Sequence, residues 1–278
     1  MVKIVFSDID GTFLTDDKRV TARTEQAVKQ LLAKGIPFVL VSARMPEAIY
    51  PITDAMGIRI PLISYSGALV LTESGDELYS LKMEQDETAS FLAAAAQDFP
   101  QAAVNYYTGH HWYVEDASDP RVVNEMKITG AVAEERHFSD CLAEGICPHK
   151  ILMMMEPADC ERAERELKAA FPRLNVVRSS ATLLEVMDAS VTKASGIEHM
   201  LQHFRLTPQE SLSFGDNYND LEMLRYTGTS VAMGNAPQTV KEAAGEVTRS
   251  NEEDGIYDYL VRSQLIEKAG AVTSAAGN

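Results

Sequence analysis

The amino-acid sequence predicts an α/β fold, in which helices cover a parallel β-sheet and a separate α+β module is inserted. Two observations support this prediction. Short, unbroken apolar runs alternate with helical patterns near both ends of the chain, as in parallel sheets that are buried on both faces. Between residues 84 and 186 the pattern changes to hairpins and amphipathic helices, which indicates an α+β unit.

The N-terminal part predicts three strands separated by two helices. Thr21 is a suitable N-cap for the first helix, its apolar positions share one face, and Gly35 ends it. The second helical pattern covers residues 49–56. The predicted strands are the apolar runs 2–6, 36–41 and 61–65.

The inserted module is predicted to begin with an Ala-rich helix at 88–96 and a hairpin that turns at Thr108-Gly109. A strand at 150–155, a helix at 158–170 and two closing strands at 174–180 and 182–188 follow.

The C-terminal part returns to the parallel-sheet pattern. Its predicted strands and helices are 211–214, 221–226, 229–233, 240–244 and 245–248. We therefore assign residues 1–83 and 187–270 to the core domain, 84–186 to the inserted domain and 271–278 to a flexible tail.

Charge and composition argue against two classes of partner. The net charge of −16 would repel the phosphates of a nucleic acid. No apolar run reaches the roughly 20 residues that span a bilayer, and Asp8 and Asp10 interrupt the N-terminal apolar stretch, so we expect a cytoplasmic protein. The three cysteines lack metal or disulfide spacing and are predicted to be free thiols. Oligomeric state is left open.

Polar residues follow the predicted strands where these end. Ligands of parallel sheets bind at the carboxyl ends of the strands, so we expect these side chains to meet at one edge. The first strand is followed by Asp8, Asp10, Gly11 and Thr12, the second by Ser42, Ala43 and Arg44, and a later one by Asp216, Asn219 and Asp220; Lys193 precedes a helix.

Asp8 and Asp10 place two like charges next to each other. Such a pair is unfavourable unless a cation lies between the carboxylates or one of them keeps its proton. Mg²⁺ prefers oxygen ligands of this kind. Taken alone, the pair could also cap a helix or lie in an exposed turn, and Asn219 and Asp220 could cap the helix that follows them.

The four segments, in this order, resemble the motifs of the haloacid dehalogenase-like (HAD) superfamily of phosphohydrolases. The long insertion between the second and third motifs resembles the α/β cap (type IIB cap) of its Cof-type subfamily. The resemblance implies a Rossmann-like core, a cap that determines specificity, and a Mg²⁺-dependent phosphatase of small phosphate esters, sugar phosphates among them.

The resemblance also implies residue roles. Asp8 would be the nucleophile that forms an aspartyl-phosphate, Asp10 the general acid and base, and Lys193 a catalytic cation that also contacts the phosphoryl group. The implied metal ligands are Asp8, Asp216, the backbone carbonyl of Asp10 and, through water, Asp220. The other implied substrate-binding residues are Gly11, Thr12, Ser42, Ala43 and Asn219.

The sequence departs from the family pattern at two positions, with Ala43 and Ser66 where Gly and Asn are frequent. Arg44 matches a common Arg, which we leave outside catalysis as a partner for an acidic neighbour. Lys150 opens a cap strand and could bind an acidic leaving group.

Two other activities stay open. A phosphotransferase or sugar phosphomutase would use the same aspartyl-phosphate. A non-catalytic sensor of phosphorylated ligands is disfavoured, since such proteins tend to lose a catalytic aspartate.

Overall fold

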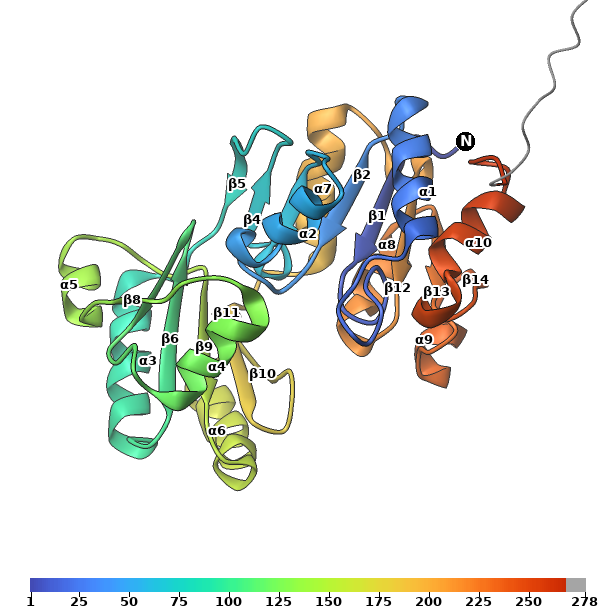
Figure 1. Cartoon of the computed structure of the whole chain (residues 1–278). Helices are drawn as coiled ribbons and strands as arrows, with labels where there is room; N and C mark the ends of the chain where they lie inside the picture. The colour runs from blue at the N-terminus through green and yellow to red at the C-terminus, as the bar shows by residue number, and fades with distance from the viewer. Residues whose placement is uncertain (269–278) are drawn as a thin grey trace, which may run out of the picture.

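The computed structural model describes residues 1–268 and contains two β-sheets, which form two separate lobes (Figure 1). The eight-stranded sheet, here called the core sheet, has the order β14-β13-β12-β1-β2-β3-β4-β5. The six-stranded sheet, the cap sheet, has the order β10-β11-β9-β6-β7-β8. The α/β class and the inserted α+β module are thus confirmed.

In the core sheet, β1 lies at the centre and is parallel to both of its neighbours, β12 and β2. β3, β12, β13 and β14 continue the parallel arrangement, as predicted. The core strands are β1 (Ile4–Asp8), β2 (Phe38–Val41), β3 (Leu62–Ser64), β4 (Leu69–Leu71), β5 (Glu77–Ser80), β12 (Ser211–Gly215), β13 (Thr229–Ala232) and β14 (Glu246–Val247).

The sequence did not predict β4 and β5, which extend the core sheet by two antiparallel strands. The apolar run of β4 is only three residues long, and β5 is partly exposed at the edge of the sheet, so neither has the buried pattern of a parallel strand. The predicted parallel sheet is therefore present from β14 to β3 and is extended by antiparallel strands at this edge.

Helices cover both faces of the core sheet. Val5 points into a cluster with α1, α2 and α10, whereas Ile4 and Phe6 point into a cluster with α7 and α8. The predicted cap of α1 is present, because the Thr21 side chain accepts a hydrogen bond from the backbone N–H of Thr24. The helices are α1 (Ala22–Ala33), α2 (Tyr50–Ala55), α7 (Lys193–Phe204), α8 (Leu221–Tyr226), α9 (Gln238–Ala243) and α10 (Gly255–Arg262), with short 3₁₀ turns η1 (Pro46–Ala48), η2 (Tyr65–Gly67), η3 (Pro208–Glu210), η4 (Tyr218–Asp220) and η5 (Asn251–Glu253).

One face of the cap sheet packs against α3 and α6, while the other packs against α4 and against core residues such as Met45 and Tyr65. Thr108 pairs with His111, so the hairpin turns at Gly109-His110, one residue later than predicted. The cap elements are α3 (Gln85–Asp98), β6 (Ala103–Thr108), β7 (His111–Val114), α4 (Pro120–Thr129), β8 (Glu134–Glu135), α5 (Phe138–Ala143), β9 (Lys150–Met154), α6 (Pro157–Ala170), β10 (Leu174–Arg178) and β11 (Leu183–Asp188).

The change of sheet falls near the predicted domain boundaries. The last core strand before the insertion, β5, ends at Ser80. Asp188, the last residue of β11, still pairs with Leu174 in the cap sheet. The domain boundaries themselves stay a prediction, and the predicted tail 271–278 lies outside the described residues. Within those residues, no helix combines the length and the apolarity that crossing a bilayer requires.

Candidate active site

The carboxyl ends of β1, β2 and β12 bring the predicted polar residues to one edge of the core sheet. Asp8 is in register with Val41, and Ser7 with Phe214, so the residues that follow β2 and β12 flank the end of β1. A cavity of about 460 Å³ opens here, between the core and the cap. Predicted site residues on its wall are Asp8, Asp10, Ser42, Ala43 and Asn219.

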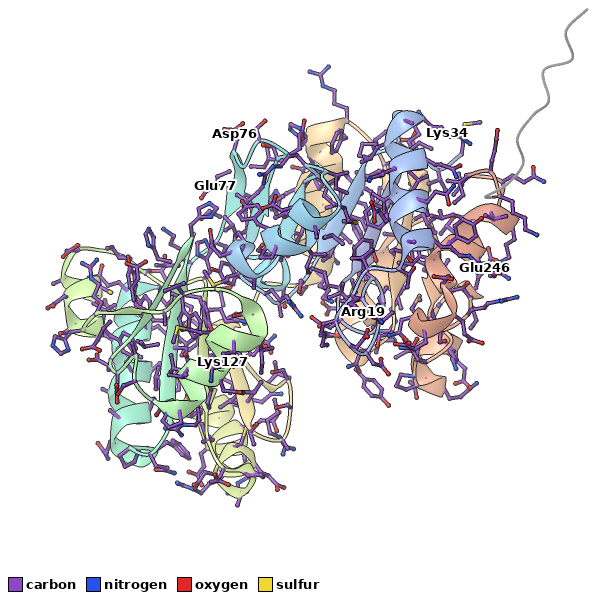
Figure 2. All side chains as sticks on the ribbon, viewed as in Figure 1. Arg19, Lys34, Asp76, Glu77, Lys127 and Glu246 are labelled. Carbon is purple, nitrogen blue, oxygen red and sulfur yellow. The ribbon has the colours of Figure 1, made fainter. Side chains whose placement is uncertain are left out.

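In Figure 2, the labelled Arg19 lies in the core lobe and the labelled Lys127 in the cap lobe. Arg19 follows the wall residue Lys18 in a core loop, and Lys127 precedes the wall residue Ile128 on α4 of the cap. The cavity is therefore shared by the two lobes, with Asp8 and Asp10, the predicted catalytic residues on its wall, on the core side.

Lys193 lies buried between two carboxylates. It is the first residue of α7, where Thr192 provides the N-cap. Its Nζ donates to Asp8 Oδ1 at 2.5 Å and to Asp220 Oδ1 at 2.6 Å. Burial opposes its charge, but Asp220 and Asp8 hold the pKa of Lys193 above its ordinary value, so it stays an ammonium.

Asp220 is fully buried and uses both carboxylate oxygens. Besides the bond from Lys193, its Oδ2 accepts hydrogen bonds from the backbone N–H groups of Asp216 (2.9 Å) and Asn217 (3.0 Å). Asp220 thus shapes the turn that carries Asp216 and orients Lys193, which fits the indirect role that the sequence indicated.

The Asp216 carboxylate is oriented by the loop that follows β1. Thr12 donates its hydroxyl to Asp216 Oδ1 at 2.7 Å, and Asn235 donates to the Gly11 carbonyl at 2.8 Å. Gly11 has a φ of 83°, and a side chain there would collide with the Asp216 carboxylate. In the described structure the cavity wall includes neither Gly11 nor Thr12. Both residues were predicted to bind substrate, which stays a prediction; the contacts of the structure connect Thr12 to Asp216 and place Gly11 against the same carboxylate.

Asp8, Asp216 and Asp220 form a group that fits a divalent cation, since one oxygen of each lies within 4.8 Å of the others. Burial raises the pKa of Asp216 to about 6, against the Thr12 hydrogen bond, and Asp220 adds to the rise. Burial also raises the pKa of Asp8, against the charge of Lys193. One ammonium therefore does not balance the three carboxylates, and the donor set is the oxygen-only type that Mg²⁺ prefers.

Asp10 lies apart from this group and has its own cations. Arg44 binds its carboxylate with two hydrogen bonds, of 2.8 and 2.7 Å, and Lys18 donates to it at 2.8 Å. Burial opposes ionisation of Asp10, but the hydrogen bonds and charges of Arg44 and Lys18 outweigh it and lower its pKa. Arg44 does pair with an acidic neighbour, and that neighbour is the predicted general acid.

The sequence did not assign Arg44 to catalysis, and it did not indicate the contacts of Lys18 with Asp10 or of Asn235 with Gly11. Arg44 could have been found, because the parallel register of β1 and β2 places the residues after Val41 beside those after Asp8. Lys18 lies in a loop and Asn235 follows β13, and neither position has a sequence pattern that indicates its contact.

The predicted phosphate-binding residues differ in whether their side-chain polar groups already form hydrogen bonds within the protein. Ser42 is buried, and its hydroxyl oxygen accepts from the Arg44 backbone N–H at 3.2 Å. Asn219 is exposed on the cavity wall. Ser66, where the family often has Asn, has a left-handed φ of 56°, and its N–H donates to the Ser42 carbonyl at 2.9 Å. Ser66 therefore supports the Ser42 backbone.

Comparison with known proteins gives matches that extend over both lobes. A sequence model described as haloacid dehalogenase-like hydrolase matches residues 5–260. A candidate phosphatase of Haemophilus influenzae is 39% identical over 256 residues, which are 92% of this chain and 96% of that protein.

Two solved structures share the fold. A haloacid dehalogenase-like hydrolase from Bacteroides thetaiotaomicron has a TM-score of 0.85 at 26% identity, covering 95% of this chain and 100% of its own. A sugar phosphatase of haloacid dehalogenase subclass IIB has a TM-score of 0.81 at 25% identity, with coverage of 95% and 100%. The likeness therefore includes the cap as well as the core.

Proposed function

The chain belongs to the haloacid dehalogenase-like hydrolase family, and we propose that it is a Mg²⁺-dependent phosphatase of small phosphorylated metabolites, with sugar phosphates as the favoured class. The observation that carries the proposal is the buried contact of Lys193 with Asp8, at the edge of a cavity large enough for a small ester. The candidate phosphatase from Haemophilus influenzae and the subclass IIB sugar phosphatase support it.

Asp8 and Asp216 would hold the metal through their carboxylates, Asp10 through its backbone carbonyl and Asp220 through water. When bound, Mg²⁺ would supply positive charge that offsets the clustered carboxylates and the phosphoryl oxygens. Thr12 and Asn235 would keep Asp216 and the Gly11 backbone in place for it.

In the first half of the reaction, an Asp8 carboxylate oxygen attacks phosphorus, and the bond between phosphorus and the ester oxygen breaks. An aspartyl-phosphate forms, and Asp10 gives a proton to the departing alkoxide. Lys193, Ser42, Asn219 and backbone N–H groups of the loops would donate to the phosphoryl oxygens.

In the second half, Asp10 takes a proton from a water molecule that attacks the same phosphorus. The bond to Asp8 breaks and inorganic phosphate leaves. Acid–base assistance of this kind is worth about 10²–10⁴ in rate. Because Arg44 and Lys18 hold Asp10 ionised, Asp10 has to lose part of this pairing to carry a proton as the ester enters.

The test is phosphate release from p-nitrophenyl phosphate and a panel of sugar and nucleotide phosphates, with Mg²⁺ or with EDTA. We expect release only with Mg²⁺ and its loss in Asp8→Asn, whereas Asp54→Asn, a change at an exposed ion pair with Arg59, keeps full activity. Equal turnover by Asp8→Asn would contradict the role of Asp8.

Consumption of ester with little free phosphate would favour the phosphotransferase or phosphomutase instead. The cytoplasmic location and the absence of nucleic-acid partners stay predictions.

A further inference from the structure

The cap side of the cavity has a mixed wall. Tyr107 on β6, Leu152 on β9 and Leu183 on β11 present apolar surface, and between them lie one lysine and two glutamates. We use the term cap wall for Tyr107, Glu125, Lys150, Leu152, Leu183 and Glu185. These residues line the same cavity as Asp8 and Asp10 but come from the cap, so we expect them to border the part of a substrate that leaves.

The lysine of the cap wall already has polar and charged partners within the protein. Lys150 is buried, and its Nζ donates to the Ala43 carbonyl at 2.7 Å. The Glu185 carboxylate lies 3.8 Å from the same ammonium, which is also 5.1 Å from the centre of the Tyr107 ring. Lys150 therefore connects the cap to the loop after β2, and its charge is balanced within the protein. It is poorly placed to bind the acidic leaving group considered from the sequence.

The two glutamates lack hydrogen-bond donors. Among residues 1–268, no hydrogen bond reaches the carboxylate of Glu125 or of Glu185, although the Glu185 side chain is only 12% exposed. Burial raises the pKa of Glu125, against the charges of Lys150 and Arg44, and Glu185 adds to the rise. Neither carboxylate is among the fully buried polar atoms without a partner, so solvent reaches their oxygens, and hydroxyl groups of a ligand could replace that water as donors.

The other cations of the cavity wall are also engaged, because Arg44 and Lys18 both bind Asp10. A second anionic group on the substrate would thus find carboxylates and, among the described residues of the cavity wall, no unpaired cation. Hydroxyl groups, by contrast, could donate to Glu125 and Glu185 while the apolar residues contact the carbon skeleton.

We propose that Glu125 and Glu185 determine specificity, accepting hydrogen bonds from hydroxyl groups of the leaving group and rejecting leaving groups that carry a second negative charge. This inference rests on the proposed phosphatase activity and names its substrate class, the monophosphates of neutral polyhydroxylated compounds. Like charges in a partly buried site are a typical means of such rejection.

The experiment compares two open-chain esters that differ only in one terminal group, sorbitol 6-phosphate with a hydroxymethyl group and 6-phosphogluconate with a carboxylate. We expect kcat/KM to be at least about tenfold higher for the neutral leaving group. Glu185→Gln and Glu125→Gln should each reduce this ratio about three- to tenfold, because the amide removes the negative charge and keeps the shape. Glu161→Gln, on the exposed face of α6, is the matched control and should leave the ratio unchanged.

The proposal would be overturned if the wild type had a ratio of the two kcat/KM values near one. It would also be overturned if both cap-wall variants kept the ratio of the wild type. So would the absence of turnover of both sugar esters while p-nitrophenyl phosphate is still hydrolysed. In each case hydrolysis of p-nitrophenyl phosphate leaves the proposed phosphatase activity intact, whereas failure with all three esters would contradict that activity itself.

Discussion

On the core side of the cavity the carboxylates have partners, whereas on the cap side they have almost none. Asp8 and Asp220 share Lys193, and Asp10 is bound by Arg44 and Lys18. The two cap glutamates, Glu125 and Glu185, receive no hydrogen bond from the described residues.

This difference in hydrogen-bond partners matches two tasks that we propose for the cavity, reaction on the core side and substrate recognition on the cap side. Reacting groups need a defined orientation before the substrate arrives, and paired, buried side chains supply it. Recognition groups need free acceptors that a ligand can satisfy. The following predictions test this division, beginning with the largest expected effect.

Lys193→Met removes the central partner of the core side. Asp8 and Asp220 would be left buried and unpaired, a change that typically costs about 3–5 kcal/mol of stability. We expect phosphate release to fall by at least about 10³-fold, together with a lower urea midpoint. Lys168→Met, at an exposed position in the last turn of α6, is the control. An active and stable Lys193→Met enzyme would contradict the assignment.

Arg44→Gln breaks the pairing of Asp10. The Asp10 carboxylate loses its two-bond partner and its orientation toward the leaving oxygen, so kcat/KM for glucose 6-phosphate, whose alkoxide needs a proton, should fall about 10- to 100-fold. Arg44→Lys keeps the charge without the two parallel bonds and should fall less. If Arg44→Gln has wild-type kinetics, Arg44 is only a structural partner.

His149 links the core to the cap, and its titration should make the stability of the fold depend on pH. It is buried, its Nδ1 accepts from the Gly109 N–H at 2.9 Å, and Nε2 therefore carries the proton toward Ser80 Oγ, at 2.9 Å. Burial lowers the pKa of His149 from 6.5 to about 3, and the positive charges of Lys82 and His110 add to this.

Between pH 6.5 and 3 the unfolded chain takes up a proton at His149 that the folded chain does not, so stability falls as the pH falls. From pH 6.5 to 5 the loss should be roughly 2 kcal/mol. His149→Gln can keep both hydrogen bonds without titrating and should remove this loss in urea unfolding, while His203→Gln, at an exposed position, should not. An unchanged pH dependence in His149→Gln would contradict the assignment.

Asn235→Ala gives the smallest expected effect. Asn235 holds the Gly11 carbonyl and lies 3.5 Å from Asp216 Oδ2, so its loss should loosen the carboxylate group. We expect about tenfold more Mg²⁺ to be needed for half-maximal activity, with little change at saturation. Asn124→Ala, on the exposed surface of α4, should behave as wild type. If Asn235→Ala and the wild type needed the same Mg²⁺ concentration for half-maximal activity, Asn235 would not support the metal site.

Much of the fold was predictable because its signals are local. The alternation of apolar runs and helices predicted β1, β2, β3 and the strands after 211, and local patterns predicted the cap hairpin and the cap strands β9, β10 and β11, but not β8. The missed strands β4 and β5 are short or partly exposed, so local burial did not distinguish them from loops.

The candidate site was predictable only in part. The residues at the strand ends do meet, but the bond of Thr12 to Asp216 and the close approach of Gly11 to the same carboxylate were not predicted. Their position beside Asp216 follows from the pairing of β1 with β12, which no local pattern indicates.

By itself, the sequence determined the α/β class, the inserted module and the polar residues at the ends of the core strands. These features depend on burial and spacing along short segments, which the residue types reveal directly. Only the tertiary structure decided which charges are neutralised. Asp10 and Arg44 are 34 positions apart, and Lys150 and Ala43 are 107 apart. Whether such groups meet depends on strand order and on where the cap packs, because the strength of a charge interaction depends on distance and burial.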